Sequence, residues 1–204
     1  MREGAMVTTT LLLERLHDSQ DAEAWRLFDE RFRGVLIATG LRLGLTRTDA
    51  EDAAQETMLQ ALREYQAGKY DRARGRLSSW IVGIARHRIL DARRQGARRA
   101  GHMAALSEVA AMNDVRESDV ADAFDHALER HIFEEAWRVL KEETKGDSAS
   151  LEAFELTSLR GVAIASAARM TGLSVDQVYL ARNRVSKRLR AAVERVDRAI
   201  RDGV

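Results

Sequence analysis

The side chains that could do chemistry in this sequence are arginines with an aromatic residue among them. Residues 79–94, SWIVGIARHRILDARR, hold four arginines and Trp80 within an otherwise strongly apolar stretch. Arginine side chains bind phosphate groups, and an aromatic ring can stack on an unpaired base. The segment therefore favours nucleic-acid binding, although a lone tryptophan is also common in a protein core.

An α-helix over this segment would place its apolar residues on one face and its basic residues on the other. The face toward the core would be an apolar stripe of Leu77, Ile81, Ile84 and Ala85. Arg88 and Asp91 lie beside that stripe at the spacing of an ion pair along the helix. The opposite side presents a basic set, with Trp80 at its boundary, that comprises Arg86, His87, Arg93 and Arg94.

Charge is distributed unevenly, although the net charge of the 204-residue chain is only +1. Residues 72–100 carry nine arginines and one aspartate, a net charge of +8. Residues 101–162 have a net charge of −8, and residues 163–204 have one of +5. Two basic blocks separated by an acidic one suggest two contacts with a polyanion, although solvated helix faces would produce the same pattern.

Enzymatic chemistry has little support in the sequence. Cysteine is absent, which removes thiol catalysis and thiolate metal sites. Four residues with metal-binding side chains match no metal-ligand spacing, and they are His126, Glu129, His131 and Glu134. No Ser/His/Asp set and no glycine-rich phosphate loop is present in the sequence. We expect no catalytic residue, no metal ion and no cofactor.

The sequence predicts a cytoplasmic, all-α protein. It contains no apolar stretch of about 18 residues and no signal-peptide pattern, and the absence of proline favours helices. Apolar periodicity predicts helices over residues 21–43, 48–65, 77–94, 127–145, 150–160, 163–171 and 174–198, the second beginning at a capping box of Thr48 with Glu51. We expect two small helical domains, residues 1–95 and 127–204, joined by a flexible linker of residues 96–126.

The predicted helix over residues 48–65 carries a surface of another kind. Its face toward the core comprises Ala53, Ala54, Thr57, Met58, Ala61 and Tyr65. Its outward face comprises Asp52, Gln55, Glu56 and Leu59. An acidic face with leucine at its surface is poorly suited to DNA and is well suited to docking on another protein.

Residues 162–190, VAIASAARMTGLSVDQVYLARNRVSKRLR, have the pattern of a helix-turn-helix. Gly172 can adopt the left-handed conformation that ends a helix, and Ser174 with Gln177 can form a capping box for the next one. That next helix would bury a stripe of Val178, Ala181, Val185, Leu189 and Val196. The opposite face comprises Asp176, Leu180, Asn183, Arg184 and Lys187. These side chains could read base edges or phosphates in a major groove. Ordinary helical bundles, however, carry similar solvated faces.

Two parts of the sequence together resemble a known family. DAEDAAQETMLQAL at residues 49–62 and YDRARGRLSSWIVGIARHRILDARR at residues 70–94 resemble region 2 of the sigma-70 family. LEAFELTSLRGVAIASAARMTGLSVDQVYLARNRVSKRLR at residues 151–190 resembles region 4. A chain with only these two regions is similar to the extracytoplasmic-function (ECF) sigma factors of bacterial RNA polymerase. The resemblance implies a region 2 bundle of three to four helices and a region 4 helix-turn-helix.

The resemblance also implies a role for each surface. The docking residues Asp52, Gln55, Glu56 and Leu59 would bind the clamp helices of the polymerase β′ subunit, and the β flap would be a second polymerase contact. The loop at residues 70–76 would capture a flipped minus-10 base, and the minus-10 residues would be Tyr70, Arg74, Trp80, Arg86, His87, Arg93 and Arg94. We expect Tyr70 to form the base pocket, His87 its floor, and Trp80 its support from the core margin. The minus-35 duplex would be read by Ser174, Asp176, Gln177, Tyr179, Leu180, Asn183, Arg184 and Lys187.

The implied function is promoter recognition and DNA melting, with core RNA polymerase and promoter DNA as partners. An anti-sigma factor is left open as a further partner, and no membrane contact is expected. The alternative is a two-domain helix-turn-helix regulator that is not a polymerase subunit, because response-regulator output domains carry a similar recognition helix. That alternative leaves the acidic docking face and the helix with Trp80 unexplained.

Overall fold

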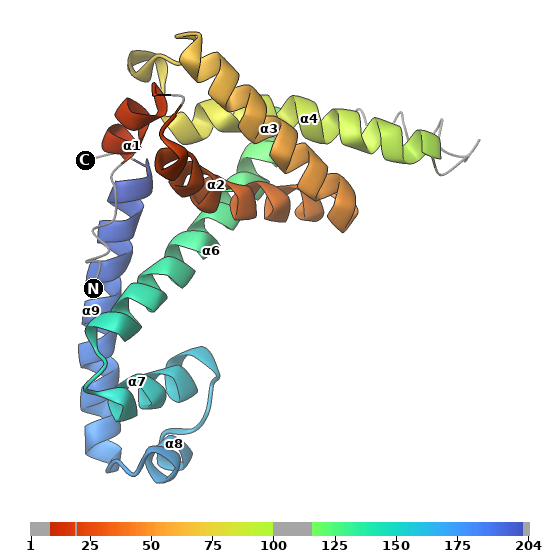
Figure 1. The fold of residues 1–204 in the computed structure, drawn as a ribbon. Coiled ribbons are helices and arrows are strands. Elements are labelled where there is room, and N and C mark those ends of the chain that lie inside the picture. The colour runs from red at the N-terminus through yellow and green to blue at the C-terminus, as the bar shows by residue number, and fades with distance from the viewer. Residues whose placement is uncertain (1–8, 19, 100–115, 202–204) are drawn as a thin grey trace. The chain divides into compact units, whose positions relative to one another are not determined.

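A computed structural model describes residues 9–18, 20–99 and 116–201 of the chain (Figure 1). Within these ranges the chain is helical and contains no strand, so the all-α prediction is confirmed. The chain divides into two compact units, residues 1–131 with 199–204 and residues 132–198. None of the described helices is long and apolar enough to cross a membrane.

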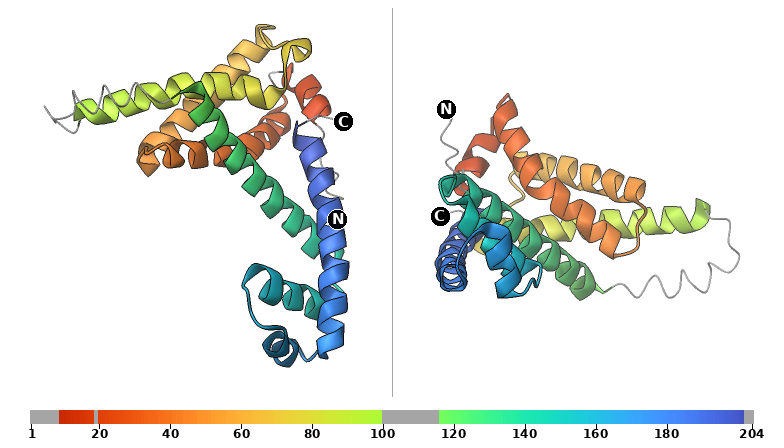
Figure 2. Two further views of the ribbon diagram at one scale, coloured as in Figure 1. Left: turned by 180° about the vertical axis from the view of Figure 1, so that it is seen from behind. Right: turned by 90° about the horizontal axis from the view of Figure 1, so that it is seen from below.

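The first unit is built on α2 (Ala22–Arg42), α3 (Arg47–Gln66) and α4 (Leu77–Arg99), preceded by the short α1 (Thr9–Leu16). α2 and α3 lie side by side, and α4 packs on α3 (Figures 1 and 2). Large apolar residues of α2 and α4 enclose small residues of α3. The resulting core residues are each at most 5% exposed, and they are Phe28, Phe32, Val35, Leu36, Ala53, Ala54, Met58, Ala61, Leu77, Ile81, Ala85 and Ile89.

α2 and α3 approach each other closely at Gly40. A Cβ atom at this position would lie 3.1 Å from both Ala50 Cβ and Leu45 Cδ1, closer than an ordinary van der Waals contact. Glycine at position 40 therefore lets the two helices meet directly after the turn. Gly44 forms that turn with a φ of 87°, in the left-handed region that favours glycine, as the predicted end of the first long helix requires.

The start of α3 differs from the prediction. The capping box of Thr48 with Glu51 is wrong, because the N-cap residue is Thr46, whose hydroxyl oxygen accepts a hydrogen bond from the Asp49 N–H at 3.1 Å. Both threonines precede an acidic residue at the same spacing, so the local pattern does not separate them. Leu45 is only 8% exposed, and a buried residue directly before the N-cap fixes the point at which the chain enters the helix.

α4 continues to Arg99, beyond the predicted end at Arg94, and Arg99 pairs with Asp49 at the start of α3. The predicted ion pair between Arg88 and Asp91 is wrong. Arg88 Nη1 lies 3.5 Å from Glu56 Oε2 on α3, and Asp91 pairs instead with Arg94 at 3.2 Å. Arg88 is on the side of α4 that packs on α3, so a partner on the neighbouring helix replaces the one along its own helix.

The segment predicted as a linker is helical at both of its ends. Residues 96–99 belong to α4 and residues 117–126 to α6 (Glu117–Glu143), while residues 100–115 lie outside the described ranges. The helix predicted to begin near Ala127 therefore begins about three turns earlier, at Glu117. Acidic residues dominate the composition here and hide an apolar stripe with helical spacing, which comprises Val120, Ala123, Phe124 and Leu128, each at most 3% exposed.

The second unit contains α7 (Ser148–Phe154), a π-helical turn η2 (Glu155–Leu159), α8 (Ile164–Thr171) and most of α9 (Val175–Arg201). α7 and α8 lie beside the N-terminal half of α9 (Figure 1). Small side chains form much of the core, so the helices can pack closely. This core comprises Ala153, Ala168, Val178 and Ala181, with Ile164 and Leu173 packed against it.

The turn between α8 and α9 has the geometry that its sequence predicts. Gly172 ends α8 in the left-handed conformation, with a φ of 71°. Ser174 Oγ accepts from the Gln177 N–H at 3.1 Å, and the Ser174 N–H donates to Gln177 Oε1 at 2.8 Å. The predicted capping box is confirmed. The predicted buried stripe of α9 is also confirmed, with at most 7% exposure for Val178, Ala181, Val185, Leu189 and Val196.

Candidate protein-docking and nucleic-acid surfaces

The outward face of α3 holds the four residues predicted for protein docking. All four are exposed, and they are Asp52, Gln55, Glu56 and Leu59. Leu59 is 44% exposed, which is a large fraction for a leucine side chain in a helix that packs on two others. The residues predicted for the opposite face are buried except for Tyr65, which is half-buried. These four exposed residues are called the α3 docking face below.

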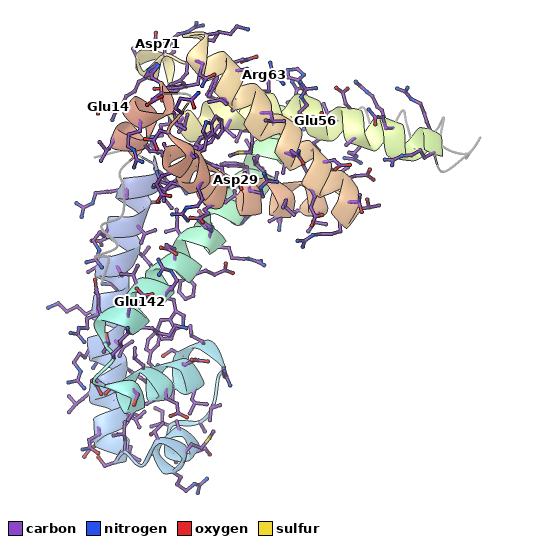
Figure 3. The ribbon with its side chains drawn as sticks, viewed as in Figure 1. Glu14, Asp29, Glu56, Arg63, Asp71 and Glu142 are labelled. Carbon is purple, nitrogen blue, oxygen red and sulfur yellow. The ribbon has the colours of Figure 1, made fainter. Side chains whose placement is uncertain are left out.

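A groove of about 420 Å³ lies beside the α3 docking face, between α2 and α3. Figure 3 labels Asp29 on α2, and Glu56 and Arg63 on α3. The groove is lined by Ala22, Trp25, Arg26, Asp29, Arg33, Gln55, Met58 and Leu59. The place of Trp25 at this groove is not evident from the sequence, because the groove is formed by the packing of α2 on α3.

The charges at the groove are largely paired within α2. Arg33 donates hydrogen bonds to both carboxylate oxygens of Asp29 at 2.6–2.9 Å, and these bonds raise the pKa of the Arg33 guanidinium. On α3, Glu56 pairs with Arg88, whereas Asp52 forms no ion pair within the described ranges. The α3 docking face thus presents one uncompensated carboxylate and an exposed leucine.

A row of aromatic rings runs from His17, directly after α1, through α3 and the following loop to α4. The ring centroids are 4.7 Å apart for His17 and Tyr65, 6.1 Å for Tyr65 and Tyr70, and 5.2 Å for Tyr70 and Trp80. The Tyr70 hydroxyl donates to the Gly75 carbonyl oxygen at 3.2 Å, which closes the loop. Burial raises the pKa of the Tyr70 hydroxyl. Tyr70 and Trp80 therefore form an aromatic pair at the start of α4.

Arg74 and His87 are both exposed. Arg74 belongs to the 3-10 turn η1 (Arg72–Arg74), whose preceding residue Asp71 accepts a hydrogen bond from the Ala73 N–H at 2.9 Å. His87 follows Trp80 by about two helical turns, so it lies on the same face of α4 and roughly 10 Å further along. Among the described rings, those in contact with Tyr70 are Tyr65 and Trp80.

The other basic residues predicted for the minus-10 strand differ in exposure. Arg94 is exposed and pairs with Asp91, while Arg93 is half-buried. Arg86 is also half-buried, at a cavity of about 190 Å³ lined by α4 and the first part of α6. The remaining lining residues are Ser78, Ser79, Val82, Gly83, Ala121, Phe124 and Asp125. Acidic α6 therefore lies beside one arginine that the sequence assigned to DNA.

The exposed face of α9 divides into two groups. Ser174 and Gln177 are exposed, but their side chains are engaged in the capping box. The second group lies on one outward stripe with Tyr179 at its margin, and it comprises Asp176, Leu180, Asn183 and Lys187, all exposed. Tyr179 and Leu180 are 50% and 66% exposed, so two large apolar side chains are part of this surface.

Arg184, also predicted to contact DNA, is held by the start of α7. Its Nη2 atom lies 3.2 Å from Asp147 Oδ2 and donates to Ser150 Oγ at 3.0 Å. Arginine has five N–H donors, so these contacts leave others for a phosphate group while they fix α9 against α7. Sequence spacing carried no signal of the contact, because Ser150 and Arg184 are 34 residues apart.

No metal site is evident within the described ranges, where no group of three or more His, Asp or Glu side chains is arranged to hold an ion. The histidines and glutamates of α6 form no such group either, and they are His126, Glu129, His131 and Glu134.

Residues 28–99 match the sigma-70 region 2 family. The match begins within α2 and ends with α4, so it includes the α3 docking face, the loop with Tyr70 and the basic residues of α4. No curated protein matches the chain. Residues 28–99 are therefore similar to region 2 of the sigma-70 family.

Proposed function

We propose that this protein is an ECF-type sigma factor, which binds core RNA polymerase in the cytoplasm, recognises minus-35 and minus-10 promoter elements and promotes DNA melting. The proposal rests on three surface features that lie together within the residues that match region 2. An acidic, leucine-bearing docking face, an aromatic loop and a basic helix all lie within residues 28–99. A protein-binding surface and a surface for unpaired bases are both required of a subunit that opens DNA on an enzyme.

The α3 docking face is proposed to bind the clamp helices of the polymerase β′ subunit. Leu59 offers apolar area, and Asp52 offers a carboxylate without an intramolecular ion pair. The groove between α2 and α3 extends this surface beyond the four predicted residues, with Trp25 along its α2 side. Aromatic residues in such grooves are frequent contributors to binding energy.

The pair of Tyr70 and Trp80 is proposed to hold the unpaired minus-10 base. Stacking on an aromatic side chain contributes roughly 1–3 kcal/mol per base in single-strand sites. Trp80 contacts Tyr70 directly and would support it, while His87, two turns along α4, would face the neighbouring nucleotide. Arg74, Arg86, Arg93 and Arg94 would contribute contacts to phosphates, which make opening sensitive to salt.

α8 and α9 are proposed to act as a helix-turn-helix that reads the minus-35 element as duplex DNA, in a domain that also contacts the β flap. The left-handed Gly172, the capping box and the outward stripe of α9 support this assignment. The width of the major groove admits one α-helix. Asn183 and Lys187 would contact a base edge and a phosphate, respectively, and Arg184 would add a phosphate contact from its position against α7.

Run-off transcription with core polymerase over a promoter library tests the proposal. A sigma factor makes core polymerase initiate at a defined subset of promoters, and core polymerase without the chain does not initiate there. A helix-turn-helix regulator that is not a polymerase subunit would bind its DNA sites alone and would not copurify with core polymerase. Specific DNA binding without any effect on initiation would reject the sigma-factor proposal in favour of that regulator.

A further inference from the structure

The outward stripe of α9 has an apolar centre. Leu180 is 66% exposed, more than any other large apolar side chain within the described ranges. At the helical period of 100° per residue, Leu180 lies among Asp176, Asn183 and Lys187 and opposite the buried stripe that contains Val178 and Val185. Leu180 is therefore an exposed apolar side chain at the middle of an otherwise polar stripe.

Two further apolar side chains belong to the same end of α9. Tyr179 is 50% exposed at the margin of the stripe, and Val175 is 44% exposed in the first turn of the helix. Neither packs into the core of the second unit, which α9 contacts through Val178 and Ala181. The N-terminal half of α9 therefore presents apolar area to solvent at the residues that would enter a groove first.

Charge around this apolar area favours a polyanion as the partner. Residues 175–190 carry five basic side chains and one acidic side chain. The distinctive apolar group of the DNA major groove is the 5-methyl group of thymine, and side chains without hydrogen-bonding groups read it by contact. A leucine placed among an asparagine and a lysine is thus suited to one thymine methyl group within a site that also offers hydrogen-bond acceptors and phosphates.

We infer that Leu180, flanked by Tyr179, contacts the 5-methyl group of a thymine in the upstream promoter element and so makes the protein prefer a T·A pair at one position. The inference rests on the proposed function, because it requires α9 to lie in a major groove. It goes further by assigning the base-reading role to an apolar contact, alongside the polar contacts of Asn183 and Lys187.

Deoxyuridine substitution tests the inference, since deoxyuridine differs from thymidine only by the methyl group. The probe is a duplex selected from a randomised upstream library by the full chain bound to core polymerase. Each thymine of the probe is then replaced singly by deoxyuridine, and the affinity of the complex is measured. We expect one position at which the replacement weakens binding by about fourfold, the effect of removing one methyl group from a buried contact.

Variants at position 180 assign the effect to its source. Leu180→Ala should bind the thymine and deoxyuridine probes equally, whereas Leu180→Met, which keeps apolar volume, should retain the preference for thymine. Lys187→Ala is the matched control on the same stripe, and it should weaken binding to both probes by the same factor. Because Leu180 is largely exposed, helix content by circular dichroism should be the same in all variants.

The outcomes separate this inference from the proposed function. Sequence-selective binding without any deoxyuridine effect would overturn the inference and leave the sigma-factor proposal standing. A deoxyuridine effect that persists in Leu180→Ala would also overturn it, as would a Leu180→Ala variant that loses affinity for core polymerase but keeps the methyl preference. If the polymerase-bound chain showed no sequence selectivity for upstream DNA, the proposed role of α9 and the inference would both be rejected.

Discussion

α3 and α9 both display an exposed leucine on an outward stripe, opposite a stripe that is buried. Leu59 is 44% exposed and Leu180 is 66% exposed. The helices differ in the charges around the leucine, since Asp52 and Glu56 accompany Leu59, whereas Asp176 and the basic residues Arg184 and Lys187 accompany Leu180. Hydrophobic periodicity therefore identifies the outward face of a helix in both cases, and the charge on that face is the basis for proposing protein as the partner of α3 and DNA as the partner of α9.

The largest expected effect is loss of polymerase binding when the charge of the α3 docking face is reversed. The double variant Asp52→Arg with Gln55→Ala should bind core polymerase on the order of a hundredfold more weakly, because it reverses the charge of a carboxylate proposed to lie in the interface, and a mismatched charge there costs several kcal/mol. Fluorescence titration of labelled chain with core polymerase measures this affinity.

Asp122→Arg is the matched control for this double variant. It makes the same acidic-to-basic change at an exposed position on α6, and we expect it to retain the affinity of the unaltered chain for core polymerase. Equal affinities for the α3 double variant and this control would show that the α3 docking face does not bind polymerase, and the contrast with α9 would fail.

The polar residues of α9 should give smaller and distinguishable effects. Asn183→Ala should weaken binding to the preferred upstream sequence by about tenfold and relax the preference at one base, because a base-edge contact contributes about 1–3 kcal/mol. Lys187→Ala should weaken binding to all sequences alike and reduce the dependence of log affinity on log salt concentration by about one. Identical salt dependence and sequence preference in both variants would mean that this stripe does not face DNA.

Arg184 should affect stability as well as DNA binding, because its contacts join α9 to the start of α7 within the second unit. Arg184→Ala should lower the free energy of unfolding of that unit by up to about 1 kcal/mol, the usual contribution of a partly exposed ion pair. Denaturant titration followed by circular dichroism measures the loss. Asp147→Asn should produce a similar loss through the same contact, and a destabilisation seen only with Arg184→Ala would place the contribution of Arg184 elsewhere.

The smallest expected effect is a pH dependence confined to the first unit. Hydrogen bonds from Arg15 and from the Ala24 N–H lower the pKa of Asp21 to about 2. An unperturbed aspartate titrates near 3.9, so the contact is fully stabilising above about pH 4 and is lost as the pH falls through about 2. The protection factors of the α1 amides, which correct for the intrinsic pH dependence of exchange, should fall over that range, and Asp21→Asn should remove this decrease. An unchanged pH profile in the variant would assign the acid sensitivity to other groups.

The faces of the helices could be predicted from the sequence more reliably than the contacts between helices. The alternation of Ala53 and Met58 with Asp52 and Leu59 follows from the helical period alone, and so does the buried stripe of α9. The choice of Thr46 over Thr48 as the N-cap depended on the burial of Leu45. Such a choice is tertiary, because two local patterns of equal quality compete and core packing decides between them.

In the candidate sites, too, the exposed faces could be predicted from the sequence and the contacts between helices could not. Exposure of the α3 docking face follows from periodicity, whereas the groove with Trp25 exists only because α2 packs on α3. The engagement of Arg184 by Asp147 and Ser150 joins distant parts of the chain. The first part of α6 was missed because its acidic composition resembles that of a linker, although Val120 and Phe124 are buried.

We propose that the polymerase-bound chain opens promoter DNA through Tyr70, and permanganate reactivity of minus-10 thymines measures this opening most directly. Core polymerase with the chain should make these thymines reactive on a duplex promoter, and core polymerase alone should not. Tyr70→Ala should form the closed complex with nearly unchanged affinity but lose most of this reactivity, and a pre-melted promoter should restore transcription. Equal reactivity with the chain and with Tyr70→Ala on the duplex promoter would contradict the account.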